Sequence, residues 1–267
     1  MKLAWAFFKR DASIALSYRV AFAAQLLGNF LLVGLLYYVS RTVGLENVPA
    51  LAEYGGNFMA FALIGIALTD CVLVSLVGFA QQVRESQTTG TLEATLISPV
   101  PLPLILIYSS LWGYFLSAVR FLLYIAAGTA LGGLHAEKMN VPVCLVIFAL
   151  TVISFLGIGI LWAGIVLLVK RGEAIMGFIS IIVMLLSGML FPVKVLPGWM
   201  QYLSQVIPLT AALDGMRQAM LNGAGFDQLS GILTRLSIFA ILLLAIGLVG
   251  FQYAVKLGRR QGSLTQY

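Results

Sequence analysis

The sequence predicts an all-α polytopic membrane protein with six transmembrane helices. Of its 267 residues, 61% are hydrophobic and only 10% are charged, which is more apolar side chain than a water-soluble core of this length can bury. The mean hydropathy of +1.01 agrees with this. A stretch of about 20 apolar residues at 1.5 Å each crosses the hydrocarbon layer. We expect six such spans, at residues 20–40, 57–80, 103–131, 142–169, 173–192 and 229–255, in a single unit over residues 1–267.

Residues 1–19 precede the first span and are expected to form an amphipathic helix that lies in the membrane interface. No small-x-small cleavage site follows the first apolar run, so we expect this segment to be retained. Apolar and charged side chains are mixed along it, as in helices that lie in the plane of a membrane. The apolar ones are Leu3, Phe7, Phe8, Ile14 and Leu16, and the charged ones are Lys9, Arg10, Asp11 and Arg19.

The basic residues predict the orientation. An even number of spans places both ends on one side, and the positive-inside rule makes the more basic side cytoplasmic. Ten cations fall on the side of the termini: Lys2, Lys9, Arg10, Arg19, Arg84, Lys170, Arg171, Lys256, Arg259 and Arg260. Five fall on the other: Arg41, Lys138, Lys194, Arg217 and Arg235. We therefore expect cytoplasmic termini, and we interpret the net charge of +6 as flanking anchors beside anionic lipid, not as a nucleic-acid surface.

Residues 81–101 form a polar island between the second and third spans. Its spacing predicts a short helix with Gly90 as the N-cap and Glu93 at the third position, where a carboxylate favours the positive end of the helix. Leu92 and Leu96 then share one face. Seven residues do not hold a helix alone in water, so this face should dock on the protein's own surface or in a partner's groove. The alternative is a folded loop that only joins two spans.

Residues 192–228 are too polar to span a membrane and too apolar to be solvated. Pro197 is expected to start a helix that Pro208 breaks, and a second short helix should end at Asn222 and Gly223. We expect this helical hairpin to dip into the outer leaflet. The second helix places five apolar residues on one stripe: Leu209, Ala212, Leu213, Met216 and Met220.

Two ionisable residues fall inside predicted spans. Asp70 lies midway along the second span and Arg120 within the third, where a charge needs a partner or water. We predict that they pair and brace the two spans. The alternatives are a purely structural pair, or two groups that each face a wet cavity. Cys71 and Cys144 lie in apolar spans, so we expect neither a disulfide nor a metal site.

Two groups of residues resemble the permease subunits of ATP-binding-cassette exporters of the second integral-membrane type, the family of drug and polysaccharide exporters. The first group matches the inner-loop signature: Arg84-Glu85, Gly90-Thr91-Leu92-Glu93 and Leu96-Ile97-Ser98-Pro99-Val100. The second matches the external hairpin: Phe191-Pro192, Leu196-Pro197-Gly198-Trp199, Pro208-Leu209-Thr210, and Asp214 to Arg217. The number of spans and the N-terminal helix match as well, so the resemblance covers the whole chain.

The resemblance implies a transport subunit, not an enzyme, in the cell membrane of a prokaryote. Two permease subunits would work with two ATPase subunits, and the inner-loop helix would be the coupling helix that sits in a cleft of the ATPase. The implied coupling residues are Arg84, Glu85, Gly90, Thr91, Leu92, Glu93 and Leu96. The implied hairpin residues are Pro197, Gly198, Trp199, Pro208, Asp214 and Arg217. The sequence contains no Gly-Lys-Ser or Gly-Lys-Thr phosphate loop, so we expect ATP and magnesium on the partner ATPase and no cofactor on this chain.

Within this family the substrate would be an amphipathic drug-like or lipid molecule, with a polysaccharide or lipid-linked glycan as the alternative. A secondary transporter is a weaker reading, because it needs several intramembrane carboxylates or histidines and only Asp70 qualifies. An intramembrane serine protease is a still weaker interpretation. Such an enzyme needs a histidine within a span to activate its serine, whereas His135 is expected in an outer turn.

Overall fold

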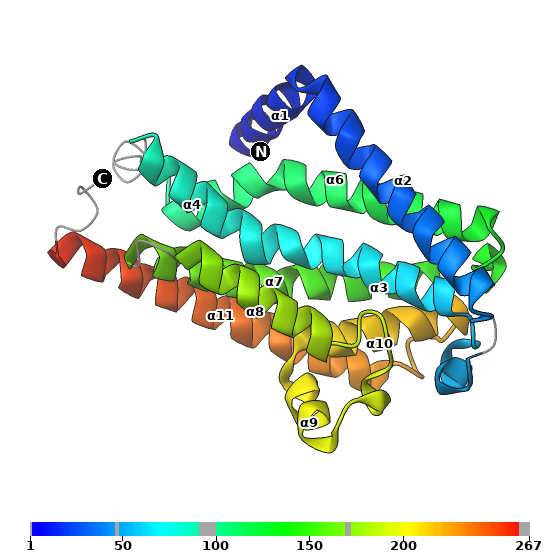
Figure 1. Cartoon of the computed structure of the whole chain (residues 1–267). Helices are drawn as coiled ribbons and strands as arrows, with labels where there is room; N and C mark the ends of the chain where they lie inside the picture. The colour runs from blue at the N-terminus through cyan, green and yellow to red at the C-terminus, as the bar shows by residue number, and fades with distance from the viewer. Residues whose placement is uncertain (1, 46–47, 91–99, 169–171, 262–267) are drawn as a thin grey trace.

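The structure, a computed structural model, describes residues 2–45, 48–90, 100–168 and 172–261, and within them every regular element is a helix (Figure 1). Among these residues, five stretches are long and apolar enough to cross a membrane. They are α2 (Arg19–Thr42), α3 (Phe58–Leu73) with its continuation, α6 (Leu102–Ala130), α7 (Val141–Leu168) and α11 (Ser230–Gln261). The all-helical class is thus confirmed, and the five stretches coincide with five of the six predicted spans.

The fifth predicted span, at residues 173–192, corresponds to a helix that is shorter than expected. Helix α8 (Gly172–Leu186) has 15 residues and a length of about 22 Å, against about 30 Å of hydrocarbon. It ends early because Gly188 adopts a φ of +76°, in the left-handed region that glycine favours. The predicted end at residue 192 is therefore wrong, and residues 187–192 form a turn.

Helix α1 (Lys2–Ser17) is a separate element, as predicted. Tyr18, with φ −93° and ψ 57°, is not helical and separates α1 from α2. None of the residues of α1 is buried. The helix lies against the first half of α6, where the rings of Phe8 and Trp112 are 5.4 Å apart (Figure 1). Helix α1 therefore stays exposed and contacts the bundle along one side, as an amphipathic helix does.

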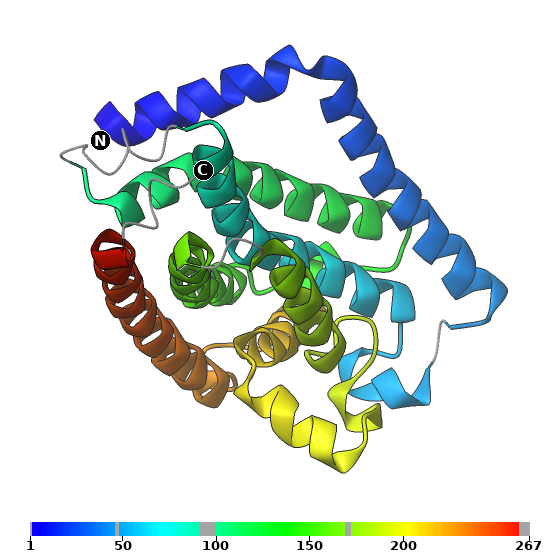
Figure 2. The same cartoon turned by 60° about the vertical axis from the view of Figure 1, so that its left-hand side comes forward.

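The middle of the bundle is formed by α3 and α7, while α11 and α2 run along opposite flanks (Figure 2). Glycines set the closest contacts of α7. A Cβ atom added to Gly157 would lie 2.3 Å from the carbonyl oxygen of Leu243 in α11, and one added to Gly247 would lie 2.1 Å from the carbonyl oxygen of Gly157. Small residues let membrane helices approach this closely. Helices α7 and α11 consequently pack backbone to backbone.

The segment at residues 192–228 folds as the predicted pair of helices, α9 (Gly198–Val206) and α10 (Pro208–Leu221), with Gly223 at φ +69° beyond the second. The predicted stripe of α10 is completely buried against the bundle. Helix α9 instead exposes Trp199, Tyr202 and Val206. Three short 3-10 helices complete the connections: η1 (Pro49–Tyr54), η3 (Ala136–Lys138) and η4 (Val193–Val195).

Candidate functional site

The second span does not end where the polar island begins. Helix α3 continues through a π-helix, η2 (Val74–Gly78), into α4 (Phe79–Thr88), so Arg84 and Glu85 lie on a helix that extends beyond the apolar part of the span. The predicted end of the second span at residue 80 is therefore eight residues too early for the helix itself. The reason is local: no glycine or proline occurs between residues 79 and 88 to stop the helix.

Gly90 ends this helix. Its φ is +69° and its N–H donates to the carbonyl of Gln87, an arrangement typical of a helix C-terminus and unlike the extended backbone of an N-cap. The other predicted coupling residues, Thr91, Leu92, Glu93 and Leu96, lie outside the described residues. Helix α4 thus ends where the predicted short coupling helix would begin.

Asp70 of α3 and Arg120 of α6 form the predicted pair. The Nε of Arg120 donates to Oδ2 of Asp70 at 2.7 Å, and the side chains are 8% and 25% exposed. Two opposite charges that neutralise each other at this depth avoid the cost of an isolated charge in the membrane. The pair joins two spans whose ends flank the polar island.

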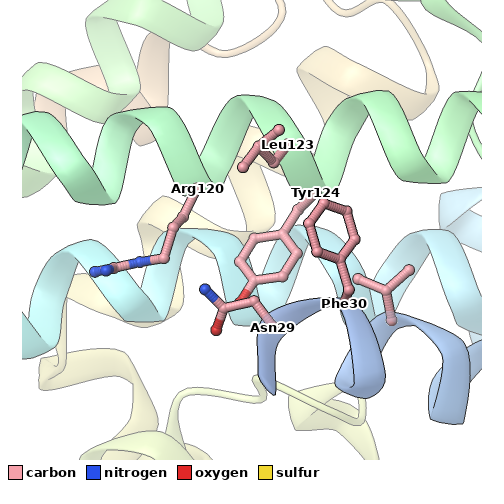
Figure 3. Close-up of a pocket in the computed structure, with 6 residues that line it drawn as sticks. Asn29, Phe30, Arg120, Leu123 and Tyr124 are labelled. Atoms are coloured by element: carbon pink, nitrogen blue, oxygen red, sulfur yellow. The ribbon is translucent and has the colours of Figure 1, made fainter. Parts of the chain in front are cut away.

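A small cavity adjoins Arg120 on the side of α2 (Figure 3). It measures about 10 Å3, the size of one water molecule, and is lined by Asn29 from α2 and by Tyr124 one turn beyond Arg120. The Nδ2 atom of Asn29 is buried without a hydrogen-bond partner among the described residues. Figure 3 shows the guanidinium of Arg120 pointing away from the other labelled residues, toward α3. Arg120 thus has one polar neighbour on a third helix, Asn29 of α2.

Among the described residues of the hairpin, the cation with the most hydrogen bonds is Arg217 of α10. Its Nη1 donates to the carbonyl of Gly188 at 3.0 Å and its Nη2 to that of Met189 at 2.8 Å. Its Nε and Nη2 also reach the carbonyl of Phe61 in α3. Gly65 leaves room for it, because a Cβ there would lie 2.9 Å from Nη2. The guanidinium therefore joins α10, α3 and the turn after α8.

The interpretation of Arg217 as a flanking anchor beside lipid is wrong, since the residue is only 3% exposed. Burial lowers the pKa of its guanidinium to about 9, which leaves it charged at neutral pH. A signal was present in the sequence. Arg217 lies four residues after Leu213 and three before Met220, and so belongs to the same helical face as the buried stripe.

The remaining hairpin residues take structural positions. Asp214 accepts hydrogen bonds from the hydroxyl of Tyr54 at 2.9 Å and from Gln218 at 2.8 Å. Burial and the neighbouring Asp214 raise the pKa of Tyr54, which keeps the phenol protonated as a donor. Pro197 caps α9, whose first residues are Gly198 and Trp199, and Pro208 is the buried first residue of α10. This cluster fixes the hairpin to the bundle.

Several long apolar helices with a charge pair between two of them define a multi-pass membrane protein. The family described as "ABC-2 type transporter" matches residues 2–221. The chain belongs to this family and is a permease subunit. Subunits of this kind are transport components that associate with an ABC ATPase subunit, and the ATPase activity resides in that partner.

The chain is also similar to the linearmycin resistance permease protein LnrN of Bacillus subtilis (strain 168). The two are 28% identical over 109 residues, which make up 41% of this chain and 28% of the relative. The similarity thus spans less than a third of the relative's length.

Proposed function

We propose that the chain is the membrane-spanning subunit of an ATP-driven exporter and that two copies of it assemble with two ATPase subunits. The family match over most of the chain carries this proposal. The projecting end of α4 supports it, because a continuous helix leads from the bundle to the coupling segment predicted at residues 90–97. Closure of the ATPase would push this segment and so move α3 and α4.

An amphipathic drug-like or lipid molecule is the proposed substrate. The name of LnrN ascribes to that relative a role in resistance to linearmycin, and the Leu196-Pro197-Gly198-Trp199 start of the hairpin resembles the drug and lipid branch of the family. Export of a polysaccharide or lipid-linked glycan is the second candidate. Transport assays with amphipathic compounds and with a lipid-linked glycan, both in vesicles that contain the assembled complex, distinguish the two.

In the assembled complex, Leu92→Ala should lower transport-linked ATP hydrolysis while membrane insertion stays normal. Truncating a leucine that is docked on a partner removes that contact, whereas truncating a solvated leucine changes the stability little. We expect a similar loss for Glu93→Ala. Hydrolysis is measured on purified complexes whose mass confirms two permease and two ATPase chains. Unchanged hydrolysis in both variants, or transport by the permease without any ATPase, would contradict the proposal.

We propose that both termini and the tip of α4 face the cytoplasm, with the α9–α10 hairpin outside and α8 as a sixth, short span. Figure 1 shows α4 ending at one end of the bundle and α10 lying at the other. Cysteines introduced at exposed Thr88 and exposed Asn222 should therefore react with an impermeant thiol reagent from the inside and the outside, respectively. The unsubstituted chain, with free Cys71 and Cys144, gives the background. Labelling of both new cysteines from outside intact cells would disprove this topology.

A further inference from the structure

We propose that a cavity at the end of α2, where α3 begins and α6 ends, binds a phosphate group at the membrane interface. The cavity measures about 310 Å3, at the lower end of the range of about 300–1,000 Å3 that is usual for small-molecule sites. Its lining comes from the last turns of α2, the start of α3 and the turn after α6. The inference concerns binding at this cavity and does not depend on the substrate or the direction of transport.

The cavity lies at the level where three membrane spans end. Candidate spans end at Thr42 in α2 and at Ala130 in α6, and another begins at Phe58 in α3. The residues next to these three positions line the cavity. Figure 1 shows the three helix ends together, at the end of the bundle opposite the tip of α4. Because span ends mark the boundary of the hydrocarbon layer, the cavity lies at the depth of lipid headgroups.

Arg41 gives the cavity its charge. It is the one charged side chain among the described residues of the lining, and no carboxylate in the described part of the chain pairs with it. Its Nη1 donates to the hydroxyl oxygen of Tyr37 at 2.7 Å, which leaves the other N–H groups of the exposed guanidinium for a ligand. Since Tyr37 accepts this bond, its own hydroxyl hydrogen remains free as well. A cation without a counter-ion favours an anionic ligand.

Ser40 adds a buried hydroxyl without a partner. The residue is only 5% exposed and, among the described side chains of α2, it and Val33 are the buried ones. Two residues on, the hydroxyl of Thr42 donates to the carbonyl of Tyr38, whereas the hydroxyl of Ser40 makes no hydrogen bond with the described residues. Its oxygen keeps accessible surface, and Ser40 lines the cavity. A buried polar group that faces a cavity without a partner indicates a polar occupant.

The start of α3 adds the positive end of a helix. Asn57 is its N-cap, and Oδ1 accepts from the N–H of Ala60 at 3.1 Å, which leaves Nδ2 as a donor. Of the first four N–H groups of α3, that of Met59 is the one without an acceptor among the described residues. Both Asn57 and Met59 line the cavity. The start of a helix favours anions through its N–H groups and its dipole.

These groups together select a phosphate. The guanidinium of Arg41 can bind two phosphate oxygens at once, while the amide of Asn57 and the hydroxyls of Tyr37 and Ser40 are donors for the others. At the depth of the headgroups, the phosphate of a phospholipid presents this chemistry. A soluble phosphate compound presents the same chemistry from the aqueous side. A neutral lipid without phosphate leaves the charge of Arg41 uncompensated.

Native mass spectrometry of the purified full-length chain tests the proposal. The chain is equilibrated with equal amounts of phosphatidylglycerol and diacylglycerol that have identical acyl chains. We expect the phospholipid to be retained about tenfold more, which corresponds to about 1.4 kcal/mol. Arg41→Gln, a change at an exposed residue, should reduce the preference to less than about twofold. Ser40→Ala should weaken it by a smaller factor and serves if Arg41→Gln fails to fold.

Arg235→Gln is the matched control and should keep the preference. Arg235 lies in the first turns of a candidate span and over the ring of Phe239, much as Arg41 lies over the ring of Tyr37, but it does not line the cavity. A loss in this control as large as in Arg41→Gln would show that any cation near the end of a span selects the phospholipid. That result would overturn the proposal.

A second arm distinguishes the sources of the phosphate, with glycerol phosphate compared with glycerol. Selection in the lipid arm alone assigns the site to a phospholipid headgroup, and selection in both arms assigns it to the phosphate of either source. Selection in the second arm alone assigns it to a soluble phosphate compound. Equal binding within both ligand pairs, or a preference that stays unchanged in every folded variant, would also overturn the proposal.

Discussion

Asp70→Asn and Arg120→Gln should each reduce the yield of folded protein more than the double substitution does. Either single change leaves one charge buried between α3 and α6 without its partner, at a cost of about 3–5 kcal/mol. The double change leaves two neutral polar groups that still hydrogen-bond. The measurement is the monodisperse fraction after size-exclusion chromatography in detergent, relative to the total amount inserted in the membrane.

The substitutions Asp227→Asn and Lys138→Gln, each at an exposed charged residue, are the controls and should leave the yield of folded protein unchanged. For true partners, the double mutant should be less destabilised than either single mutant, and therefore less destabilised than the sum of the two single effects by at least about 3 kcal/mol. If the two single effects simply add, each residue interacts with its own surroundings, such as the cavity beside Asn29, and the bracing role fails.

Arg217→Leu should be the most destabilising change in the external segment. It leaves the carbonyls of Gly188 and Met189 without donors, at about 1–3 kcal/mol for each buried group, and removes the contacts with Phe61. Arg217→Lys should be intermediate, because one ammonium cannot reproduce a planar fork that bonds three carbonyls. The measurement is the midpoint of thermal unfolding of the purified protein in detergent.

The matched control is Arg41→Leu, an exposed arginine at the outer end of α2 that donates to the hydroxyl of Tyr37. It should shift the midpoint little. A lysine variant as stable as the original protein would show that the forked geometry of Arg217 contributes nothing. Equal drops in the unfolding midpoint for Arg41→Leu and Arg217→Leu would show that the buried hydrogen bonds of Arg217 stabilise the protein no more than the exposed contact of Arg41 does.

The sequence identifies the charge pair readily and the buried arginine poorly, for a physical reason. Asp70 and Arg120 interrupt apolar runs, so each is conspicuous and each lacks any partner nearby in sequence. Arg217 lies in a mixed polar and apolar segment, where a cation is usually solvated. Its partners are backbone carbonyls, which carry no residue-type signal, and they come from segments 28 and 156 positions away.

The ends of two helices were the other feature that could not be predicted from the sequence. The extension of α4 to Thr88 depends on the absence of a helix breaker, which hydropathy does not register. The early end of α8 depends on the backbone of Gly188, although glycine is often tolerated inside membrane helices. By contrast, the hairpin helices were predictable because Pro197, Pro208 and Gly223 act through local backbone geometry.

The continuous helix from Phe58 to Thr88 is held at two depths, and in the proposed complex its far end makes a third contact. The carbonyl of Phe61 is held by Arg217, Asp70 is held by Arg120, and Glu85 lies near the far end. Phe61 and Glu85 are 24 residues apart, or about 36 Å. A push on the tip must therefore either shift the outer hairpin by a comparable amount or be absorbed along the way. The π-turn at Val74–Gly78 lies between Asp70 and the tip, and its irregular hydrogen bonding makes it the natural point of bending. These five residues therefore decide whether the helix transmits the push as one rigid unit or bends and absorbs it.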